Sequence, residues 1–343
     1  MNRLLALSLL ALTLLAPSLT AAAAHDALAA DITLSYANFP PAPTFPCVQM
    51  ERWAKEVEKR TGGKVAVQTY PGSTLLGPKN MLRGVMGGQA DIGCMSLAYH
   101  PGVFPLLSVF EMPLGFSSAT VPSVALWDLY AERRPKEFAG VKVLTMFTSA
   151  PSNIMSKLPV RGLDDLSGLE LRASGGLSKT LELLGATPVS MPMSETPEAL
   201  QKGVVEGLLS SFDVLKDMNF AETCRYETVT NLPVYPFAVI MNLDRWNALP
   251  DDVKQVLDGL SREQAEWTGA YMDGHVDDSL NWSKEKYDIE VIDLSPSERD
   301  AMAARTEPMI AAWKQKAAAA GYDADAVLDE VRTMKRDFEA KYH

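Results

Sequence analysis

The chain has 343 residues, of which 47% are hydrophobic and 22% are charged, and its formal net charge is −11. This length predicts about two domains, and the hydrophobic fraction is sufficient for sizeable cores. The acidic balance argues against nucleic acid as a partner, because a surface that binds phosphate groups has to be basic. An anionic ligand would therefore need a local positive site.

The first 30 residues have the pattern of a secretory signal peptide. Arg3 precedes an apolar run over residues 4–15, and small residues that suit cleavage follow up to Ala30. The run is too short for a membrane span, and no cysteine stands at the cleavage site of a lipoprotein. We therefore expect a soluble mature chain that is exported to the periplasm. An uncleaved membrane anchor is the alternative.

Strands and helices alternate after the signal peptide. Residues 32–39 alternate as a strand, and the next segment is a helix whose apolar residues keep the i, i+3, i+4, i+7 spacing until Gly62 and Gly63 end it. Further strands are expected over residues 64–70 and 90–96, with a short helix over residues 81–88. This alternation predicts a parallel sheet.

The second half of the chain crosses between two units. Strands are expected near residues 141–148 and 152–159, and the chain returns through residues 235–246. Residues 250–287 contain hardly a breaker except Gly269 and Gly274, which would let a helix bend. Such a helix would be about 55 Å long, enough to span two lobes. Amphipathic helices are expected over residues 296–321 and 323–342.

These segments predict a hinged pair of α/β lobes. We assign residues 1–30 to the signal peptide, residues 31–150 plus 243–286 to lobe I, and residues 151–242 plus 287–343 to lobe II.

The cysteines and histidines indicate no metal site. Three cysteines and four histidines are scattered along the chain, and none has the spacing that zinc needs. We therefore expect neither a metal nor another cofactor. The cysteines are predicted to be buried small hydrophobic residues, and a disulfide between Cys47 and Cys94 stays open.

Residues 163–207 carry the most specific pattern. Arg172 ends a short apolar strand, Gly175 and Gly176 follow, and two helices and a strand come next. This stretch resembles the signature of the TRAP-transporter solute receptors, periplasmic proteins that capture organic acids for a membrane permease. The signature reads roughly DLKGLKIR and then LGA-PV-M-SE---ALQ-GVVDG. The matching residues are Asp165, Leu166, Gly168, Leu169, Leu171, Arg172, Leu184, Gly185, Ala186, Pro188, Met191, Ser194, Glu195, Ala199, Leu200, Gln201, Gly203, Val204, Val205 and Gly207.

The resemblance extends from about residue 32 onward, through YPGSTLLGP, G-ADIG and FEMPLGF. It implies a type II-like periplasmic binding protein whose two α/β lobes close on one organic acid, with a long helix across both lobes. It also implies delivery to a permease driven by an ion gradient, although the coupling ion is not specified. We expect a monomer.

Arg172 is the expected anchor for the ligand, because guanidinium matches a carboxylate with two parallel charge-assisted bonds. The glycines that follow would give backbone amides room to approach the same anion. The pattern alone leaves open a structural arginine paired with Glu170, Asp164 or Asp165. The resemblance favours ligand binding, and an arginine aimed into an open cleft is expected to support little packing.

Polar recognition is reduced around this arginine. Where sugar-acid and sialic-acid receptors carry charged or amide groups, this chain has Ser96, Tyr99, Pro151 or Ser152, and Leu208 to Ser210. A polyol or dicarboxylate would leave buried oxygens without donors, at about 1–3 kcal/mol each. We therefore predict an apolar or aromatic monocarboxylate. A small dicarboxylate or sugar acid is the alternative, and a ligand sensor for a histidine kinase is a more distant one.

The expected ligand contacts come from both lobes, and the aromatic ones among them are equally compatible with a place in the core. They are Arg172, Ser210, Phe212, Met193, Ser96, Tyr99, Asn38, Phe39, Ser152 and Phe237. An enzyme is not expected. Asp213, Glu195 and Glu206 are the acids that could be paired for catalysis, but neither a Ser-His-Asp order nor a phosphate loop accompanies them.

Overall fold

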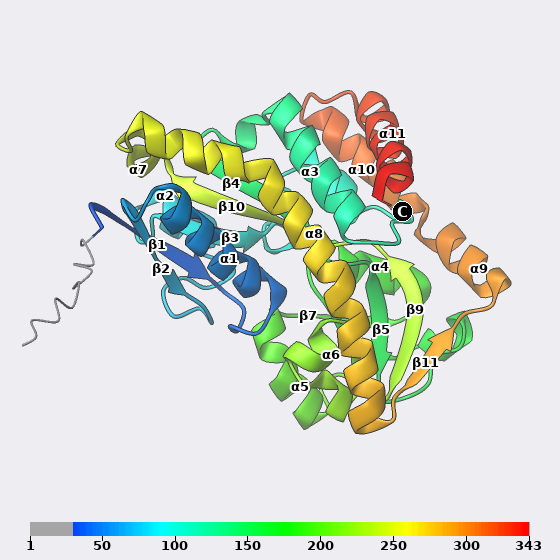
Figure 1. Ribbon diagram of the computed structural model, residues 1–343. Coiled ribbons are helices and arrows are strands. Elements are labelled where there is room, and N and C mark those ends of the chain that lie inside the picture. The colour runs from blue at the N-terminus through cyan, green and yellow to red at the C-terminus, as the bar shows by residue number, and fades with distance from the viewer. Residues whose placement is uncertain (1–29, 343) are drawn as a thin grey trace, which may run out of the picture.

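The computed structural model describes residues 30–342, which form two α/β lobes joined by a long helix (Figure 1). The signal-peptide prediction lies outside the described residues. Within residues 30–342, no helix is both long enough and apolar enough to cross a membrane. Cys47, Cys94 and Cys224 are buried free thiols, so the structure contains no Cys47–Cys94 disulfide.

The first sheet has five strands in the order β2-β1-β3-β10-β4. Strand β1 runs parallel to its neighbours β2 and β3, and β10 runs antiparallel to both β3 and β4. The expected parallel pairing is thus found for β2, β1 and β3, and β10 continues the sheet with antiparallel pairing to β3 and β4. The strands are β1 (Ile32–Asn38), β2 (Val65–Tyr70), β3 (Ile92–Ser96), β4 (Val141–Thr148) and β10 (Pro236–Asn242).

Helix α1 (Phe45–Arg60) packs on the core of the first lobe through one apolar face. Met50, Trp53, Ala54 and Val57 are buried, as their spacing predicts, and they form one face of the helix against the core. The other helices of this part are α2 (Met81–Met86), α3 (Thr120–Arg133) and the short α7 (Leu243–Asn247).

The second sheet has six strands in the order β11-β9-β5-β8-β6-β7. Strand β6, which carries Arg172, runs parallel to β7 and β8 on either side, so this residue lies inside the sheet and not at its edge. The strands are β5 (Ser152–Ser156), β6 (Glu170–Ala173), β7 (Thr187–Ser190), β8 (Gly207–Ser210), β9 (Tyr226–Leu232) and β11 (Glu290–Asp293), and the helices between them are α4 (Leu177–Leu184), α5 (Thr196–Lys202) and α6 (Val214–Asp217).

Helix α8 (Asp251–Tyr287) joins the two lobes. It contacts α1, α3 and β4 on one side and α6 on the other, and it crosses the molecule diagonally in Figure 1. Its 37 residues correspond to about 55 Å, as the sequence predicts. Gly269 has a role that the sequence did not indicate. A Cβ there would lie 2.5 Å from Cα of Thr120, so the glycine allows α8 and α3 to approach closely.

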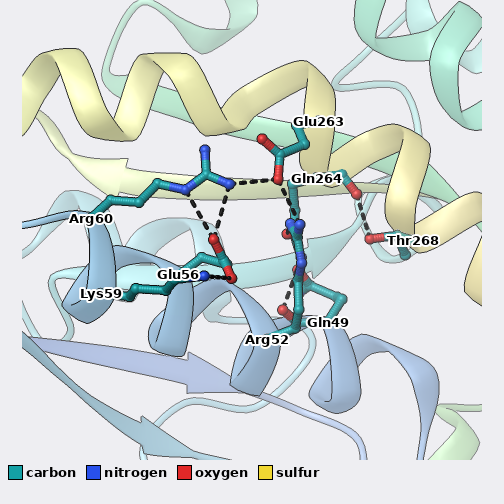
Figure 2. A network of polar contacts seen from close by, with 8 residues as sticks. All are labelled: Gln49, Arg52, Glu56, Lys59, Arg60, Glu263, Gln264 and Thr268. Atoms are coloured by element: carbon teal, nitrogen blue, oxygen red, sulfur yellow. Dashed lines mark hydrogen bonds and ion pairs between the residues drawn. The ribbon is translucent and has the colours of Figure 1, made fainter.

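A polar network fastens α1 to α8 (Figure 2). Arg52 and Arg60 donate to the same carboxylate oxygen of Glu263, at 2.6 and 2.7 Å. The side-chain amide of Gln264 donates to the main-chain and side-chain oxygens of Gln49, at 2.9 and 3.0 Å. The network therefore fixes α1, whose first residues line the cavity described below, against α8.

The lobe boundaries stay a prediction, and we propose to revise them in two places. Strand β10 pairs with β3 and β4, although the expected boundary after residue 242 put it in lobe II. Of the C-terminal helices, α9 (Pro296–Thr306) contacts α4, whereas α11 (Ala324–Tyr342) packs on α3 and α10 (Pro308–Ala319) packs on α11. We assign β10, α10 and α11 to lobe I because of these contacts. The sequence did not indicate them, since long-range contacts leave no pattern in the local sequence.

Candidate functional site

A cavity of about 60 Å³ lies between the two lobes, at the ends of strands β1, β3, β6, β8 and β10. Such an edge, outside the carboxyl ends of parallel strands, is where α/β proteins usually bind ligands. Seven of the ten expected contact residues line the cavity: Phe39, Ser96, Tyr99, Arg172, Met193, Ser210 and Phe237.

The other three expected residues do not line the cavity. The side-chain amide of Asn38 donates to the carbonyl of Pro46 at 2.6 Å, which shapes the loop before α1. Ser152 donates to the carbonyl of Pro233 at 2.7 Å, where the chain crosses between the lobes. Phe212 is buried in the core of the second lobe. The structure therefore places these residues around the site and not in it.

Arg172 is buried, with 1% of its surface exposed. Its Nε and Nη2 donate to the carbonyl of Met191 at 3.1 and 2.9 Å, and Nη2 also donates to the hydroxyl of Ser174. Within residues 30–342, Arg172 makes no ion pair and Nη1 has no hydrogen-bond partner. A buried cation without an anion is costly, so this nitrogen is suited to receive one.

Two hydroxyl groups add polar contacts beside Arg172. The amide of Met193 donates to the hydroxyl of Tyr99 at 3.2 Å, and this bond joins the two lobes. The amide of Ser174 donates to the hydroxyl of Tyr235, also at 3.2 Å. Burial raises the pKa of Tyr235 to about 12, so this hydroxyl stays protonated at neutral pH. Tyr235 therefore supplies a neutral hydroxyl group beside Arg172.

An aromatic cluster forms the apolar side of the cavity, and its rings come from the first sheet and from segments next to it. Phe237 stacks on Phe147 and Phe39, with ring centroids 5.4 and 6.3 Å apart, and it meets Phe45 edge to face at 5.4 Å. Phe39 also meets Tyr99 edge to face at 5.4 Å. Phe147 is fully buried and does not line the cavity. The cluster is thus both core and cavity wall, which unites the two interpretations that the sequence left open.

Asp213 also lines the cavity, and sequence reasoning considered it only as a catalytic acid with Glu195 and Glu206, which do not line it. It is 1% exposed, and its Oδ1 accepts from the hydroxyl of Ser211. Its Oδ2 is buried without a partner in residues 30–342. Burial, and then the nearby Asp217, raise the pKa of Asp213 to about 7. No local pattern marks this residue as a cavity group.

The remaining lining residues extend this picture. Several of them come from the loop before α1, which the sequence places in the cleft, and from the turns that follow β4, β6 and β8. They are Pro40, Thr44, Phe45, Pro46, Ser149, Ser174, Ser211, Val214 and Tyr235.

The glycines after Arg172 serve the contact between the lobes. Gly175 has φ of +54°, and a Cβ there would lie 2.9 Å from the carbonyl carbon of Ala98 and closer still to its oxygen. A Cβ on Gly176 would lie 2.5 Å from Oε2 of Glu111. Burial raises the pKa of this carboxyl to about 7. The two glycines thus allow close packing against the first lobe, and the approach of their backbone amides to the ligand anion stays a prediction.

The two sheets, the long helix and the cavity between the lobes define a periplasmic-binding-protein fold. The family model of the bacterial extracellular solute-binding proteins, family 7, matches residues 40–316, and the chain belongs to this family. Members are solute-binding receptors and not enzymes, so the predictions of the fold, the family and a non-catalytic role are confirmed. In residues 30–342 no group of three or more His, Cys, Asp or Glu side chains is arranged to hold a metal ion.

Known proteins resemble the chain over most of its length. A TRAP periplasmic solute binding protein from Desulfovibrio salexigens DSM2638 is 71% identical, with a TM-score of 0.83 over 91% of this chain and 98% of that one. Its structure is an open complex with the C-terminus of a symmetry mate in the ligand binding site. A marine metagenome TRAP protein specific for aromatic acid ligands, solved with metahydroxyphenylacetate, is 28% identical, with a TM-score of 0.84 over 89% and 99% of the two chains. The C4-dicarboxylate-binding periplasmic protein DctP of Rhodobacter capsulatus is 27% identical over 280 residues, which are 80% of this chain and 84% of that protein.

Proposed function

We propose that this TRAP solute receptor acts in the periplasm, binds an apolar or aromatic monocarboxylate between its lobes and delivers it to the membrane permease subunits of its transporter. The observation that carries the proposal is Arg172, a buried cation without an ion pair in residues 30–342, beside an aromatic wall. A ligand carboxylate supplies the missing charge, and a ring or branched apolar group fills the space along Phe39 and Phe237.

The carboxylate is held differently from the paired fork that the sequence suggests. Because Nε and Nη2 of Arg172 already donate to Met191, the guanidinium offers Nη1 to one carboxylate oxygen. The hydroxyl groups of Tyr99 and Ser210, which line the same cavity, are the donors for the second oxygen. Ser96 and Met193 complete the contacts, while Asn38, Ser152 and Phe212 position the chain around them.

The charge balance of the cavity favours a monocarboxylate over a dicarboxylate. Among the described residues that line it, Arg172 is the one arginine or lysine, and Asp213 is an acid. A second ligand carboxylate would have no cation to meet and would stand in a cavity that already holds an acid, which costs free energy in a low-dielectric space. The relative named for C4-dicarboxylates keeps this alternative in the test below.

Ligand entry requires that the lobes separate. A cavity of about 60 Å³ has room for a few water molecules, and the lobes meet closely at Gly175. Among the places where the chain passes between the lobes, the connections near residues 149–151 and 233–235 are where a hinge would turn. The relative from Desulfovibrio salexigens, solved as an open complex, supports such a movement.

Thermal-shift screening tests the ligand class, because only compounds that bind the folded state raise the melting temperature. Phenyl, indole and branched 2-oxo acids should give the largest shifts, and phenylacetamide, the neutral match of phenylacetate, should give none. Native mass spectrometry of protein purified from periplasm without refolding should show a bound acid of the same class. Larger shifts with sugar acids or C4-dicarboxylates would overturn the proposal.

A further inference from the structure

We propose that Asp213 is a second recognition group of this receptor and accepts a hydrogen bond from a hydroxyl or N–H group of the ligand. The preferred ligand then carries a donor as well as its carboxylate. This inference rests on the proposed function, because it concerns the same cavity, and it narrows the ligand class within it.

The unpaired oxygen of Asp213 is the starting observation. The side chain is 1% exposed and lines the cavity, Oδ1 accepts from Ser211, and Oδ2 has no partner in residues 30–342. More than about nine in ten buried polar groups in folded proteins have a hydrogen-bond partner. A donor on the ligand would supply the missing bond.

The neighbours of Asp213 are committed elsewhere. His275 directs its Nε2 to Asp217 at 2.8 Å and not to Asp213. Arg172 shares the cavity but forms no ion pair with Asp213 among the described residues. Asp213 precedes α6, but its carboxyl makes no capping hydrogen bond to this helix. The amides of Lys216 and Asp217 donate to its main-chain carbonyl instead, at 3.2 and 3.1 Å. A purely structural role therefore leaves Oδ2 unexplained.

The protonation state of Asp213 decides which donor suits it. The groups around it are Asp217 and Lys216 of α6, His275 and Tyr271 of α8, and Arg172 across the cavity. With a pKa near 7, the carboxyl is partly protonated at neutral pH. A ligand hydroxyl can donate to either form. A ligand ammonium group needs the ionised form, so its binding releases a proton from part of the population.

Calorimetry with matched ligands tests the inference. The probes are phenylacetate, its 3-hydroxy and 4-hydroxy derivatives, and phenylalanine, each with the wild type, Asp213→Leu and Asp213→Asn. At least one donor-bearing ligand should bind the wild type about 10- to 100-fold more tightly than phenylacetate. Asp213→Leu should remove this preference and bind phenylacetate at least as well as the wild type. Asp213→Asn should keep part of a hydroxyl preference, through its remaining oxygen, and lose a preference for ammonium.

A matched control separates recognition from burial. Glu227 of β9 is another buried carboxyl whose two oxygens have no partner in residues 30–342, but it does not line the cavity. Glu227→Gln should change the unfolding midpoint without changing the order of ligand affinities. Titrations in two buffers with different ionisation enthalpies count the protons released and tell an ammonium ligand from a hydroxyl ligand.

The outcomes separate the two proposals. If phenylacetate binds as tightly as every donor-bearing probe, or if Asp213→Leu keeps the preference, Asp213 is not a recognition group while the monocarboxylate receptor stands. If the wild type binds no apolar or aromatic acid, both proposals fail.

Discussion

Replacing Arg172 with alanine is expected to weaken binding of a monocarboxylate by about 2–5 kcal/mol, or about 30- to 5,000-fold in the dissociation constant. The reason is its place in the structure: it is 1% exposed, makes no ion pair in residues 30–342, and lines the cavity with Nη1 unbonded. Without it, the ligand carboxylate would be buried without a countercharge.

The same replacement should also cost some stability, contrary to the expectation that this arginine supports little packing. Two of its nitrogens donate to the carbonyl of Met191, which would keep only the hydroxyl of Ser174 as a side-chain donor, at 3.1 Å. Lost hydrogen bonds of this kind cost about 1–3 kcal/mol. Removal of an unpaired buried charge offsets part of this, so we expect a net loss of about 1 kcal/mol.

Arg172→Lys separates charge from geometry. An ammonium group keeps the charge but cannot hold the Met191 carbonyl and the ligand with the planar set of donors that guanidinium provides. It should recover only part of the affinity. Arg161→Ala, at an exposed arginine that pairs with Glu290, is the control and should bind normally.

Calorimetry on the four proteins, with denaturant unfolding curves on the same samples, measures both effects. If Arg172→Ala binds its acid normally while its stability collapses, the arginine is a structural residue and the carboxylate anchor lies elsewhere. If affinity and stability are both unchanged, the geometric argument from its buried contacts is wrong.

Two further predictions concern the contact between the lobes. Gly175→Ala should lower ligand affinity by holding the lobes apart, because its Cβ would meet Ala98. The control is Gly185→Ala, where φ is also positive but no heavy atom from elsewhere in the described residues lies within 4 Å of the added Cβ, and it should bind normally. With saturating ligand, small-angle scattering should show a larger radius of gyration for Gly175→Ala than for the wild type and the control, and equal radii of gyration would contradict the prediction. The pKa of Glu111 is about 7 in the folded protein and near 4.5 when the carboxyl is exposed, so the unfolded chain loses this proton first as pH rises. The free energy of unfolding should therefore fall by up to about 3 kcal/mol as pH rises from 4.5 to 7. Glu111→Gln should therefore lose less stability than the wild type between pH 5 and pH 8 in melting experiments, and identical pH profiles would refute this.

Local patterns predicted the elements that local forces determine. The apolar spacing of Met50, Trp53 and Val57 predicted α1, and the absence of breakers after residue 250 predicted α8. The motif around Arg172 placed it on a short strand before a helix, as found. These features depend on neighbours within a few residues or on one continuous signature.

Features that depend on distant partners were not predictable in the same way. Strand β10 joins the first sheet because it fits between β3 and β4, which are far from it in the sequence. The bond from Arg172 to the carbonyl of Met191, and the packing of Gly175 on Ala98, require the position of one segment against another. Asp213 follows the same rule, since a lone acid after a short strand has no distinctive pattern.

The aromatic wall and the cation belong to different lobes, and this has a consequence for selection among solutes. Phe39 and Phe237 come from the first lobe, and Arg172 comes from the second. An open receptor can hold a neutral ring on one lobe or an anion on the other, but neither contact alone stabilises the closed form relative to the open form. Under the proposed function, closure requires both contacts at once, because a molecule that has both a ring and an anion is the one that stabilises the closed form more than the open form. Substitutions among the aromatic residues of the first lobe can then change which ligand shape is accepted, while Arg172 in the second lobe keeps the requirement for a negative charge.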